Sequence, residues 1–456
     1  MFNTRKEYID LLRQLENEVF PKLKKCWGFL PWSIIQIQIG YYFHLIFSGV
    51  VDISEKRAPL QSILKEGISL QDCKRFLKSV CRLFFLIYKW NGKWKGSTIL
   101  SGYNRHSING YNQYLNPYKE VLMEENKKSE IFFIDEMFCN NSNNHLFHLC
   151  IHLRIVVLFY LKIKNSVFKQ PIENVKHNAK LVENYFRNNT SLDTGYVYSL
   201  VFSTIIDNNF YYTFFCWLLK ILKPKIVWLY NYYSNEHSAL LRAANNLNII
   251  TCEYQHSTFS NEHFAYTKWN NIDLYSECFP KLFYVWGEND KNIILHNFLG
   301  RNFVPTVVVS GNYYLNKQKK QFQNQSNTGN ILICLQGIWI PEFIENAIKE
   351  SDGIKWFFRL HPRYPQDKPR LLELHKNFPE KIEMELANQL PLYELFARVS
   401  VLITAFSGTA REANELGLKV IIFGEEGYNT YKDYIENKIF NFITNSGDLL
   451  DLVGRK

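Results

Sequence analysis

The chain has 456 residues, of which 46% are hydrophobic and 16% aromatic, and its formal net charge is +10. This length exceeds one ordinary hydrophobic core and the apolar content is too high for a disordered chain, so we expect two folded domains. The positive charge suits a phosphorylated substrate or an anionic membrane surface. Because it is spread along the chain without an RNA- or DNA-binding motif, we expect no nucleic-acid partner.

The first predicted elements are helices. Leucine, phenylalanine and valine recur at helical spacing over residues 8–30 and 60–88. The N-terminus leads into a charged helix, and no segment reaches the roughly 18–20 uninterrupted apolar residues that a membrane-spanning helix needs. We therefore expect a cytoplasmic protein. The aromatic and lysine-rich residues 84–95 are compatible with peripheral contact with an anionic membrane, or with a buried helix end and its loop.

Strands and helices alternate along the rest of the chain. Apolar strands are expected at residues 130–135, 226–230, 249–254, 282–286, 306–310 and 331–335. Residues 316–330, rich in Asn, Gln, Lys and Ser, indicate a linker. The pattern predicts an α/β protein with two doubly wound, Rossmann-like domains facing a cleft and a helix-rich start. The N-terminal domain would cover residues 1–310, Rossmann-like from about residue 130 or 226, and the C-terminal domain residues 311–456.

The ends of two C-terminal strands carry the most informative side chains. The first strand ends in Arg359, His361 and Arg363, with Pro362 stiffening the backbone. The second ends in Ser407-Gly408-Thr409 at the start of a helix. Parallel strands present such ends to a ligand, and the free N–H groups of a helix start favour a phosphate. We therefore predict that these residues bind a nucleotide.

Three further residues belong to the predicted nucleotide site. Gln336 and Gly337 end the strand that opens the C-terminal domain, and Glu412 lies in the helix after Thr409. Glu412 either reaches a ribose or only complements the helix dipole. His361 has a structural alternative as a cap at a strand end, and the Ser-Gly-Thr sequence alone would indicate no more than a helix cap.

These motifs resemble those of the GT-B glycosyltransferases that build bacterial capsules and lipopolysaccharides. His361-Pro362 resembles the His-Pro motif of the sialyltransferases, which holds a cytidine nucleotide, and Ser407-Gly408-Thr409 resembles their serine-rich phosphate motif. Trp286-Gly287 and Val309-Ser310-Gly311-Asn312 resemble the family's crossing between domains. The resemblance covers residues 226–423, less than half the chain. It extends to the Kdo transferases and to the polyol-phosphate transferases of teichoic acid synthesis.

The resemblance implies a function. We expect transfer of a sugar from a nucleotide donor, a CMP-activated acidic sugar of the sialic acid or Kdo type, to a glycan or lipid-linked glycan. Two alternatives remain: a CDP-polyol phosphotransferase of the teichoic-acid type, and a non-catalytic assembly protein with the same fold. An isomerase of the sugar-nucleotide 2-epimerase type shares the architecture, but normally needs more carboxylates in the cleft.

No cofactor and no metal are expected. The chain has no Asp-x-Asp sequence, and its histidines and nine cysteines lack metal-ligand spacing. The cysteines form no Cys-x-x-Cys pair, and most lie in apolar stretches. They are therefore expected to be buried thiols of a reducing compartment.

The sequence offers three places for a catalytic base. The first is His256, with Glu253 as the acid that orients it; this strand end resembles the histidine-bearing loop of the polyol-phosphate and capsule transferases. The alternative is that His256 only packs or positions the acceptor. The second place is Glu236-His237 at a helix start. The third is Asp135-Glu136, which resembles the acidic pair of the sialyltransferases except that Met137 stands where that family has glycine.

Overall fold

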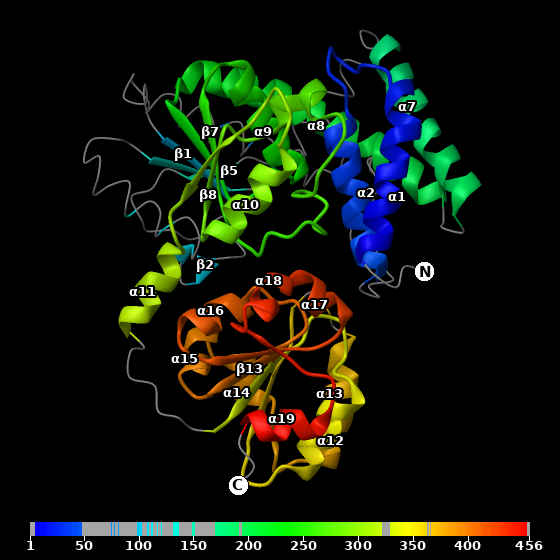
Figure 1. Ribbon diagram of the computed structural model, residues 1–456. Helices are drawn as coiled ribbons and strands as arrows, with labels where there is room; N and C mark the ends of the chain where they lie inside the picture. Colours follow the sequence, from blue (N-terminus) through cyan, green and yellow to red (C-terminus); the bar gives the residue numbers. More distant parts are fainter. Residues whose placement is uncertain are drawn as a thin grey trace. The chain divides into compact units, whose positions relative to one another are not determined.

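The computed structural model in Figure 1 describes most of the two α/β regions. The described residues are 5–47, 98–102, 107–108, 111–112, 131–135, 148–150, 169–190, 194–321, 329–362, 364 and 366–453, with single helical positions at 74, 77, 81, 116 and 120. The predicted membrane-contact residues 84–95 and the site candidates Glu136 and Arg363 lie outside these residues.

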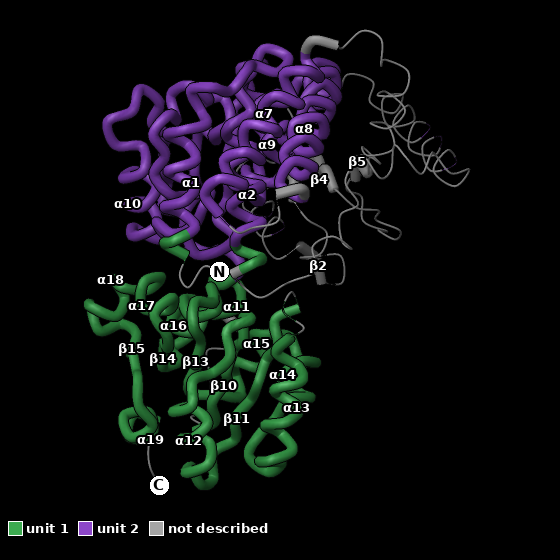
Figure 2. Tube along the Cα trace, turned by 90° about the vertical axis from the view of Figure 1, so that its right-hand side faces the viewer, with its two compact units in different colours: residues 1–7, 44–53, 315–456 green, residues 8–43, 54–314 purple. Residues whose placement is uncertain are grey.

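The chain divides into two compact units, which Figure 2 shows in green and purple. Unit 1 comprises Met1–Glu7, His44–Ile53 and Leu315–Lys456, whereas unit 2 comprises Tyr8–Phe43 and Ser54–Tyr314. The C-terminal unit therefore includes two short segments from the N-terminal part of the sequence, which the linear prediction of domains 1–310 and 311–456 did not anticipate.

Unit 2 is built on a seven-stranded parallel sheet with strand order β5-β4-β1-β6-β7-β8-β9. Its strands are β1 (Thr98–Gly102), β4 (Ile131–Asp135), β5 (His148–Cys150), β6 (Ile226–Leu229), β7 (Ile250–Tyr254), β8 (Leu282–Val285) and β9 (Thr306–Val309). A two-stranded hairpin, β2 (Ser107–Ile108) and β3 (Tyr111–Asn112), is separate. The direction in which strands are added reverses between β1 and β6, as in a doubly wound sheet.

The described helices that lie wholly or mostly in unit 2 include two pairs in contact, α7 with α8 and α8 with α9. Their bounds are α1 (Arg5–Val19), η1 (Phe20–Lys22), α2 (Trp32–Phe47), α7 (Lys169–Asn189), α8 (Thr194–Leu222), α9 (Asn235–Asn246), η3 (Ile272–Cys278) and α10 (Glu288–Asn297). The first residues of α1 and the last residues of α2 belong to unit 1. Helix α1 buries Tyr8, Leu12, Leu15 and Val19, the amphipathic pattern predicted for this region. Among the described helices, none combines the length and apolarity needed to cross a membrane.

Unit 1 shows the same reversal of strand order in a six-stranded parallel sheet, β12-β11-β10-β13-β14-β15. Its strands are β10 (Ile331–Cys334), β11 (Trp356–Arg359), β12 (Ile382–Glu383), β13 (Val401–Thr404), β14 (Lys419–Ile422) and β15 (Asn441–Phe442). Its helices are α11 (Tyr313–Gln321, which begins in unit 2), α12 (Glu342–Glu350), α13 (Asp367–Asn377), α14 (Glu385–Gln389), α15 (Leu392–Phe396), α16 (Thr409–Glu415), α17 (Glu425–Thr430), α18 (Lys432–Glu436) and α19 (Ser446–Val453). Every residue of β10 and β13 is buried, which is why these strands have continuous apolar sequences.

The two sheets confirm the predicted class, an α/β protein with two doubly wound units and a helix-rich start. Two local predictions were wrong. Helical spacing was expected over residues 8–30, but α1 ends at Val19 and is followed only by the short η1. The first residues of the expected linker 316–330 are helical, because α11 continues to Gln321. Residues 322–328 lie outside the described part.

Candidate functional site

Three loops follow neighbouring strands at the carboxyl edge of the unit 1 sheet. Strand β10 is paired with β11 on one side and with β13 on the other. The residues after these strands are Gln336-Gly337, His361 and Ser407-Gly408-Thr409 respectively. Strand order reverses between β10 and β13, so the loops diverge there and leave room for a ligand. The structure therefore brings the predicted nucleotide-binding residues to one edge.

The loop after β10 depends on a glycine. Gly337 has φ +83°, and a Cβ at this position would lie 2.9 Å from Cδ1 of Tyr364. Its N–H donates to Oδ2 of Asp367 over 2.8 Å, and burial raises the pKa of that carboxyl while the hydrogen bond opposes the rise. The neighbouring Gln336 has a buried Oε1 without a hydrogen-bond partner among the described residues. A side chain in this state favours a ligand that can donate to it.

His361 lies beside Tyr364, with ring centroids 4.9 Å apart. The hydroxyl of Tyr364 is in turn 3.2 Å from Nε2 of His44, a residue of the N-terminal segment that belongs to unit 1. His361 is half-buried, so it remains accessible to a ligand at the sheet edge. Sequence reasoning did not find His44, since nothing near it in the chain indicates a site.

Arg359 makes different contacts from those expected. Its Nη1 donates to the carbonyl oxygens of Ala387 and Leu390, over 2.9 and 2.8 Å. These carbonyls lie at the end of α14, where a helix leaves such groups without helical partners. Arg359 thus fixes the loop between α14 and α15, and its contact with a nucleotide stays a prediction.

Ser407 caps its own helix. Its Oγ accepts hydrogen bonds from the N–H of Thr409 over 3.3 Å and from Oγ1 of Thr409 over 2.8 Å. Its carbonyl oxygen accepts a hydrogen bond from the hydroxyl of Tyr431, so the backbone of this turn is held from α18's side. The helix-cap alternative is therefore part of what Ser407 does, and phosphate binding by Ser407, Gly408 and Thr409 remains a prediction.

Several of the predicted residues act on the thiol of Cys334, the last residue of β10. Burial raises its pKa to about 11, Arg359 and a hydrogen bond with Thr409 oppose the rise, and Glu412 adds to it. Arg359, Thr409 and Glu412 therefore lie around the end of β10. Among the described free cysteines, Cys26, Cys252, Cys278 and Cys334 are buried as predicted, whereas Cys81 is exposed.

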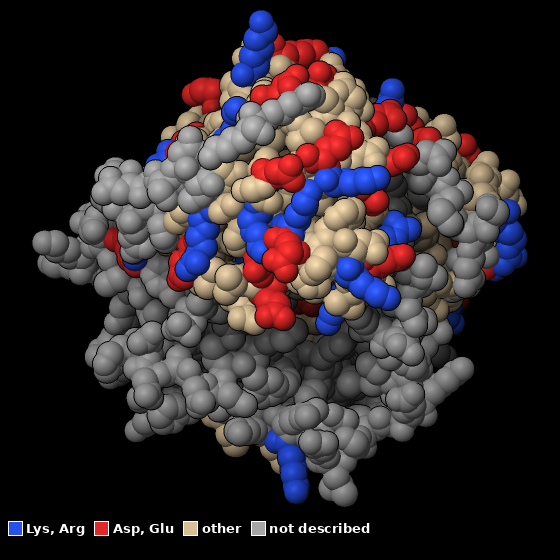
Figure 3. Space-filling view, turned by 90° about the horizontal axis from the view of Figure 1, so that it is seen from below, with Lys and Arg blue, Asp and Glu red and all other residues tan. Residues whose placement is uncertain are grey.

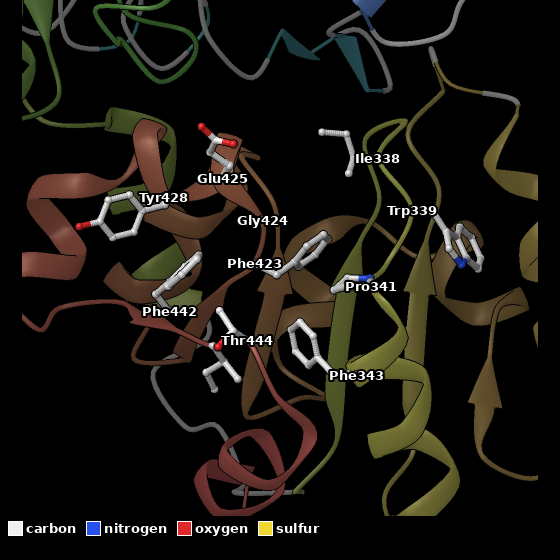
Figure 4. Close-up of a pocket in the computed structure, with 11 residues that line it drawn as sticks. Ile338, Trp339, Pro341, Phe343, Phe423, Gly424, Glu425, Tyr428, Phe442 and Thr444 are labelled. Atoms are coloured by element: carbon white, nitrogen blue, oxygen red, sulfur yellow. The ribbon is translucent and has the colours of Figure 1, made fainter. Parts of the chain in front are cut away.

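A cavity of about 550 Å³ opens at the same edge, and Figure 4 shows its lining. It lies between the loop after β10 and the ends of β14 and β15, and nearly all of its lining is apolar. Phe423, Phe442 and Phe343 supply the aromatic walls, and Glu425 stands at the start of α17 above them. Sequence reasoning did not identify this cavity, because its walls come from three separate strand ends.

In unit 2, the predicted base His256 lies just after β7 among tyrosines. The hydroxyl of Tyr233 is 3.1 Å from its Nε2, Oγ of Ser257 is 3.4 Å from the same atom, and the ring of Tyr230 is centred 4.1 Å away. Tyr230 and Tyr233 follow β6, the strand paired with β7, so both strand ends build this cluster. The imidazole is mostly buried.

The predicted pairing of Glu253 with His256 is wrong. Glu253 is completely buried and accepts hydrogen bonds from the N–H of Tyr232 over 2.9 Å and from the hydroxyl of Tyr266. His256 lies two residues beyond the end of β7, and the oxygens of Glu253 accept hydrogen bonds from Tyr232 and Tyr266 rather than from the imidazole. Tyr233 makes the contact with His256 that was expected of Glu253.

The other base candidates lie at the start of α9 and at the end of β4. His237 is buried, and its Nδ1 is 2.9 Å from Oδ1 of Asn231. Glu236 lies in the first turn of α9. Asp135 is the last residue of β4, in register with Gly102 and Cys150 of the adjacent strands. These three positions, and Glu136 beyond the described residues, stay predictions.

Charges of both signs are interspersed on the face that Figure 3 shows. Lysine and arginine side chains of the described residues alternate there with aspartate and glutamate, without a large patch of one sign. Among the described residues on that face, neither sign of charge predominates.

No protein-family model and no curated protein sequence matches the chain. Among solved structures, it is similar to a Listeria monocytogenes protein described as a UDP-N-acetylglucosamine 2-epimerase, at 13% identity and a TM-score of 0.50, covering 78% of this chain and 86% of that one. It is also similar to the UDP-GlcNAc 2-epimerase of Methanocaldococcus jannaschii, at 16% identity and a TM-score of 0.46, over 79% and 91% of the two chains. A third similar structure is the wall teichoic acid polymerase TagF, at 11% identity and a TM-score of 0.42, over 85% and 89%.

At these identities the likeness concerns the fold alone. The chain has the two-unit α/β fold of the GT-B type, as the sequence predicts. The finer resemblance to sialyltransferases and Kdo transferases stays a prediction.

The burial of Glu253 generates a prediction about pH. Burial raises its pKa from 4.5 to about 8, against the opposing hydrogen bonds of Tyr266 and Tyr232. The folded state then binds a proton that the unfolded state loses above pH 4.5, so this group's contribution to stability is full below pH 4.5 and is lost as pH rises to about 8. Glu253→Gln replaces the acid with a neutral amide of similar size that does not titrate.

We expect the thermal midpoint of the Glu253→Gln variant to fall less between pH 5 and 8 than that of the wild type, measured by circular dichroism. An exposed-carboxylate variant, Glu373→Gln, serves as the control and should follow the wild type. Parallel curves for wild type and Glu253→Gln would show that Glu253 does not titrate in this window.

Proposed function

We propose that the protein is a transferase that uses a nucleotide-activated donor, bound by unit 1, and a hydroxyl acceptor. The observation that carries this proposal is the meeting of Gln336-Gly337, His361 and Ser407-Gly408-Thr409 where the unit 1 sheet reverses its strand order. Hydrogen-bond donors at such an edge suit a phosphate group. The GT-B-type fold supports the same interpretation, because it has two Rossmann-like units in one chain.

The donor class follows from the resemblance of His361-Pro362. We propose a CMP-activated acidic sugar of the sialic acid or Kdo type, and a glycan or lipid-linked glycan as acceptor in capsule or lipopolysaccharide synthesis. In the reaction, the acceptor oxygen forms a bond to the anomeric carbon as the bond from that carbon to the phosphate oxygen breaks. CMP leaves with the electron pair, and hydrogen bonds to its phosphate stabilise the charge. No metal ion is part of this proposal.

His256 is the proposed general base. It would take the proton of the acceptor hydroxyl, a task suited to a group whose ordinary pKa is about 6.5. Tyr233 is 3.1 Å from Nε2 and holds the ring in place. The second candidate function, a CDP-polyol phosphotransferase, is favoured by the position of His256 just after β7, since this loop resembles the histidine-bearing loop of those enzymes. Identification of the group added to the acceptor, a sugar or a polyol phosphate, distinguishes the two.

The nucleotide assignment is tested by calorimetry with CMP, CDP, UDP and GDP. We expect a cytidine nucleotide to bind, and His361→Ala to weaken binding by about 1–3 kcal/mol through loss of a hydrogen bond to a charged group. His375→Ala, a substitution in the last turn of α13, is the matched control and should bind as the wild type does. Equal affinity of His361→Ala and wild type would refute the role of His361.

The proposed base is tested by single-turnover kinetics. We expect His256→Ala to lower the rate by about 10²–10⁴ with nucleotide affinity nearly unchanged. Tyr233→Phe should cost less and should shift the pH profile, because the hydroxyl contacts the imidazole without taking the proton. If Asp135→Ala or Glu136→Ala abolishes turnover while His256→Ala is mild, the acidic pair is the base instead.

The proposed location is the cytoplasm, with peripheral contact with the inner face of the cell membrane. A lipid-linked acceptor would require such contact, and the net charge of +10 favours anionic lipids. We expect co-flotation with vesicles containing phosphatidylglycerol at low salt, lost as the Debye length shortens at high salt. Absence of flotation at low salt would contradict membrane contact and indicate a freely diffusing acceptor.

A further inference from the structure

Arg5, the first described residue, belongs to unit 1 and contacts Glu426. Its main-chain N–H donates to Oε1 of Glu426 over 2.7 Å, and its Nε lies 3.5 Å from Oε2. The two side chains are only 11% and 7% exposed. An ion pair this well buried costs desolvation energy, unlike an exposed pair at a surface. The contact therefore calls for an explanation beyond surface charge.

Arg5 also covers the residue that precedes the predicted phosphate motif. Its guanidinium carbon lies 4.0 Å from the centroid of the Phe406 ring, and Phe406 is followed directly by Ser407. A cation over an aromatic ring is held in place by the ring's negative face. The cation is thus held over the side chain that directly precedes the Ser407-Gly408-Thr409 turn.

The turn itself is held rigid by α17 and α18. A Cβ on Gly427 of α17 would lie 2.4 Å from the carbonyl oxygen of Ala405, so the helix approaches this backbone as closely as only glycine permits. The hydroxyl of Tyr431 donates to the carbonyl oxygen of Ser407. Glu426 is in the same helix as Gly427, so Arg5 and the turn are fixed to one support. A binding group is placed precisely when packing and hydrogen bonds hold it, as α17 holds Arg5 and this turn.

The guanidinium has donors to spare. Its Nε faces Oε2 of Glu426 at 3.5 Å in the ion pair, whereas Nη1 and Nη2 make no hydrogen bond to the described residues. Arginine offers five N–H donors in a planar fork that matches two oxygens of a phosphate. A bound anion can accept hydrogen bonds from the two terminal nitrogens.

We propose that Arg5 binds a phosphate group of the donor nucleotide beside Ser407, so that the N-terminal segment completes the nucleotide site of unit 1. The identity of the ligand, a cytidine mono- or diphosphate unit, rests on the proposed function. Glu426 anchors the segment through the main-chain N–H of Arg5. The cation adds to the hydrogen-bond donors of the turn and stabilises the charge that the phosphate gains when the donor bond breaks.

The test compares the full-length wild type with Arg5→Ala and Arg5→Lys, by calorimetry with CDP and with cytidine. Arg13→Ala is the matched control, since Arg13 is in the same helix but pairs with Asp10 at the surface. We expect Arg5→Ala to raise the dissociation constant of CDP about 10- to 100-fold. Arg5→Lys should be intermediate, because lysine keeps the charge but loses the fork. Arg13→Ala should bind as the wild type does, and cytidine affinity should be equal in all four proteins.

Unchanged CDP affinity in Arg5→Ala would overturn the proposal. Glu426→Gln separates binding from anchoring, because it loses the ion pair and keeps Arg5. We expect it to lower the melting temperature and to weaken CDP binding far less than Arg5→Ala does. Equal losses of affinity in the two variants would mean that Arg5 is only an anchor, and would also overturn the proposal.

Binding of inorganic pyrophosphate tests the phosphate site at Arg5 independently of the proposed function. If the wild type binds no nucleotide, the proposed function fails. Binding of pyrophosphate that is weakened by Arg5→Ala would then still support a phosphate site at Arg5. Pyrophosphate binding that is unaffected by the substitution, or absent, would refute that site as well.

Discussion

The reversal of strand order between β10 and β13 is the constraint on which the rest of unit 1 depends. The chain runs from β10 to β11 and β12 toward one side of the sheet, and from β13 to β14 and β15 toward the other, so the loops after β10 and β13 diverge. Every residue of both strands is buried, and the sheet therefore holds its edge rigid. The glycine of the first loop and the capped turn of the second are consequences of how closely the chain packs at this edge.

Unit 2 has the same reversal of strand order but builds a different environment. Its sheet edge holds an imidazole among tyrosines, with Tyr233 in hydrogen-bonding distance of His256. Glu253, in β7, is buried with its oxygens directed to Tyr232 and Tyr266. An acid so placed stabilises the loop rather than the histidine. In the proposed transfer reaction, unit 1 would supply hydrogen-bond donors to the phosphate and unit 2 would supply the proton acceptor.

Two short N-terminal segments belong to unit 1, and both contact loops at the predicted nucleotide site. Arg5 pairs with Glu426 after β14, and His44 lies 3.2 Å from the hydroxyl of Tyr364 after β11. Unit 1 is therefore not a contiguous piece of the sequence. A fragment that begins at residue 315 would lack both contacts, so the C-terminal unit should be studied in the full chain.

The sequence by itself determined the α/β class, most strands of both sheets and the strand ends that carry His361 and Ser407. These features are local: apolar runs of strand length stop at polar residues, and that pattern survives in any context. Tertiary structure decided the rest. Strand β1 is central in unit 2 yet was not predicted, because its five residues carry little signal without their neighbours. The direction of Glu253, the contacts of Arg359 with α14 and the place of Arg5 all depend on which segments cover them, and residues far apart in the chain leave no mark of that contact in the sequence.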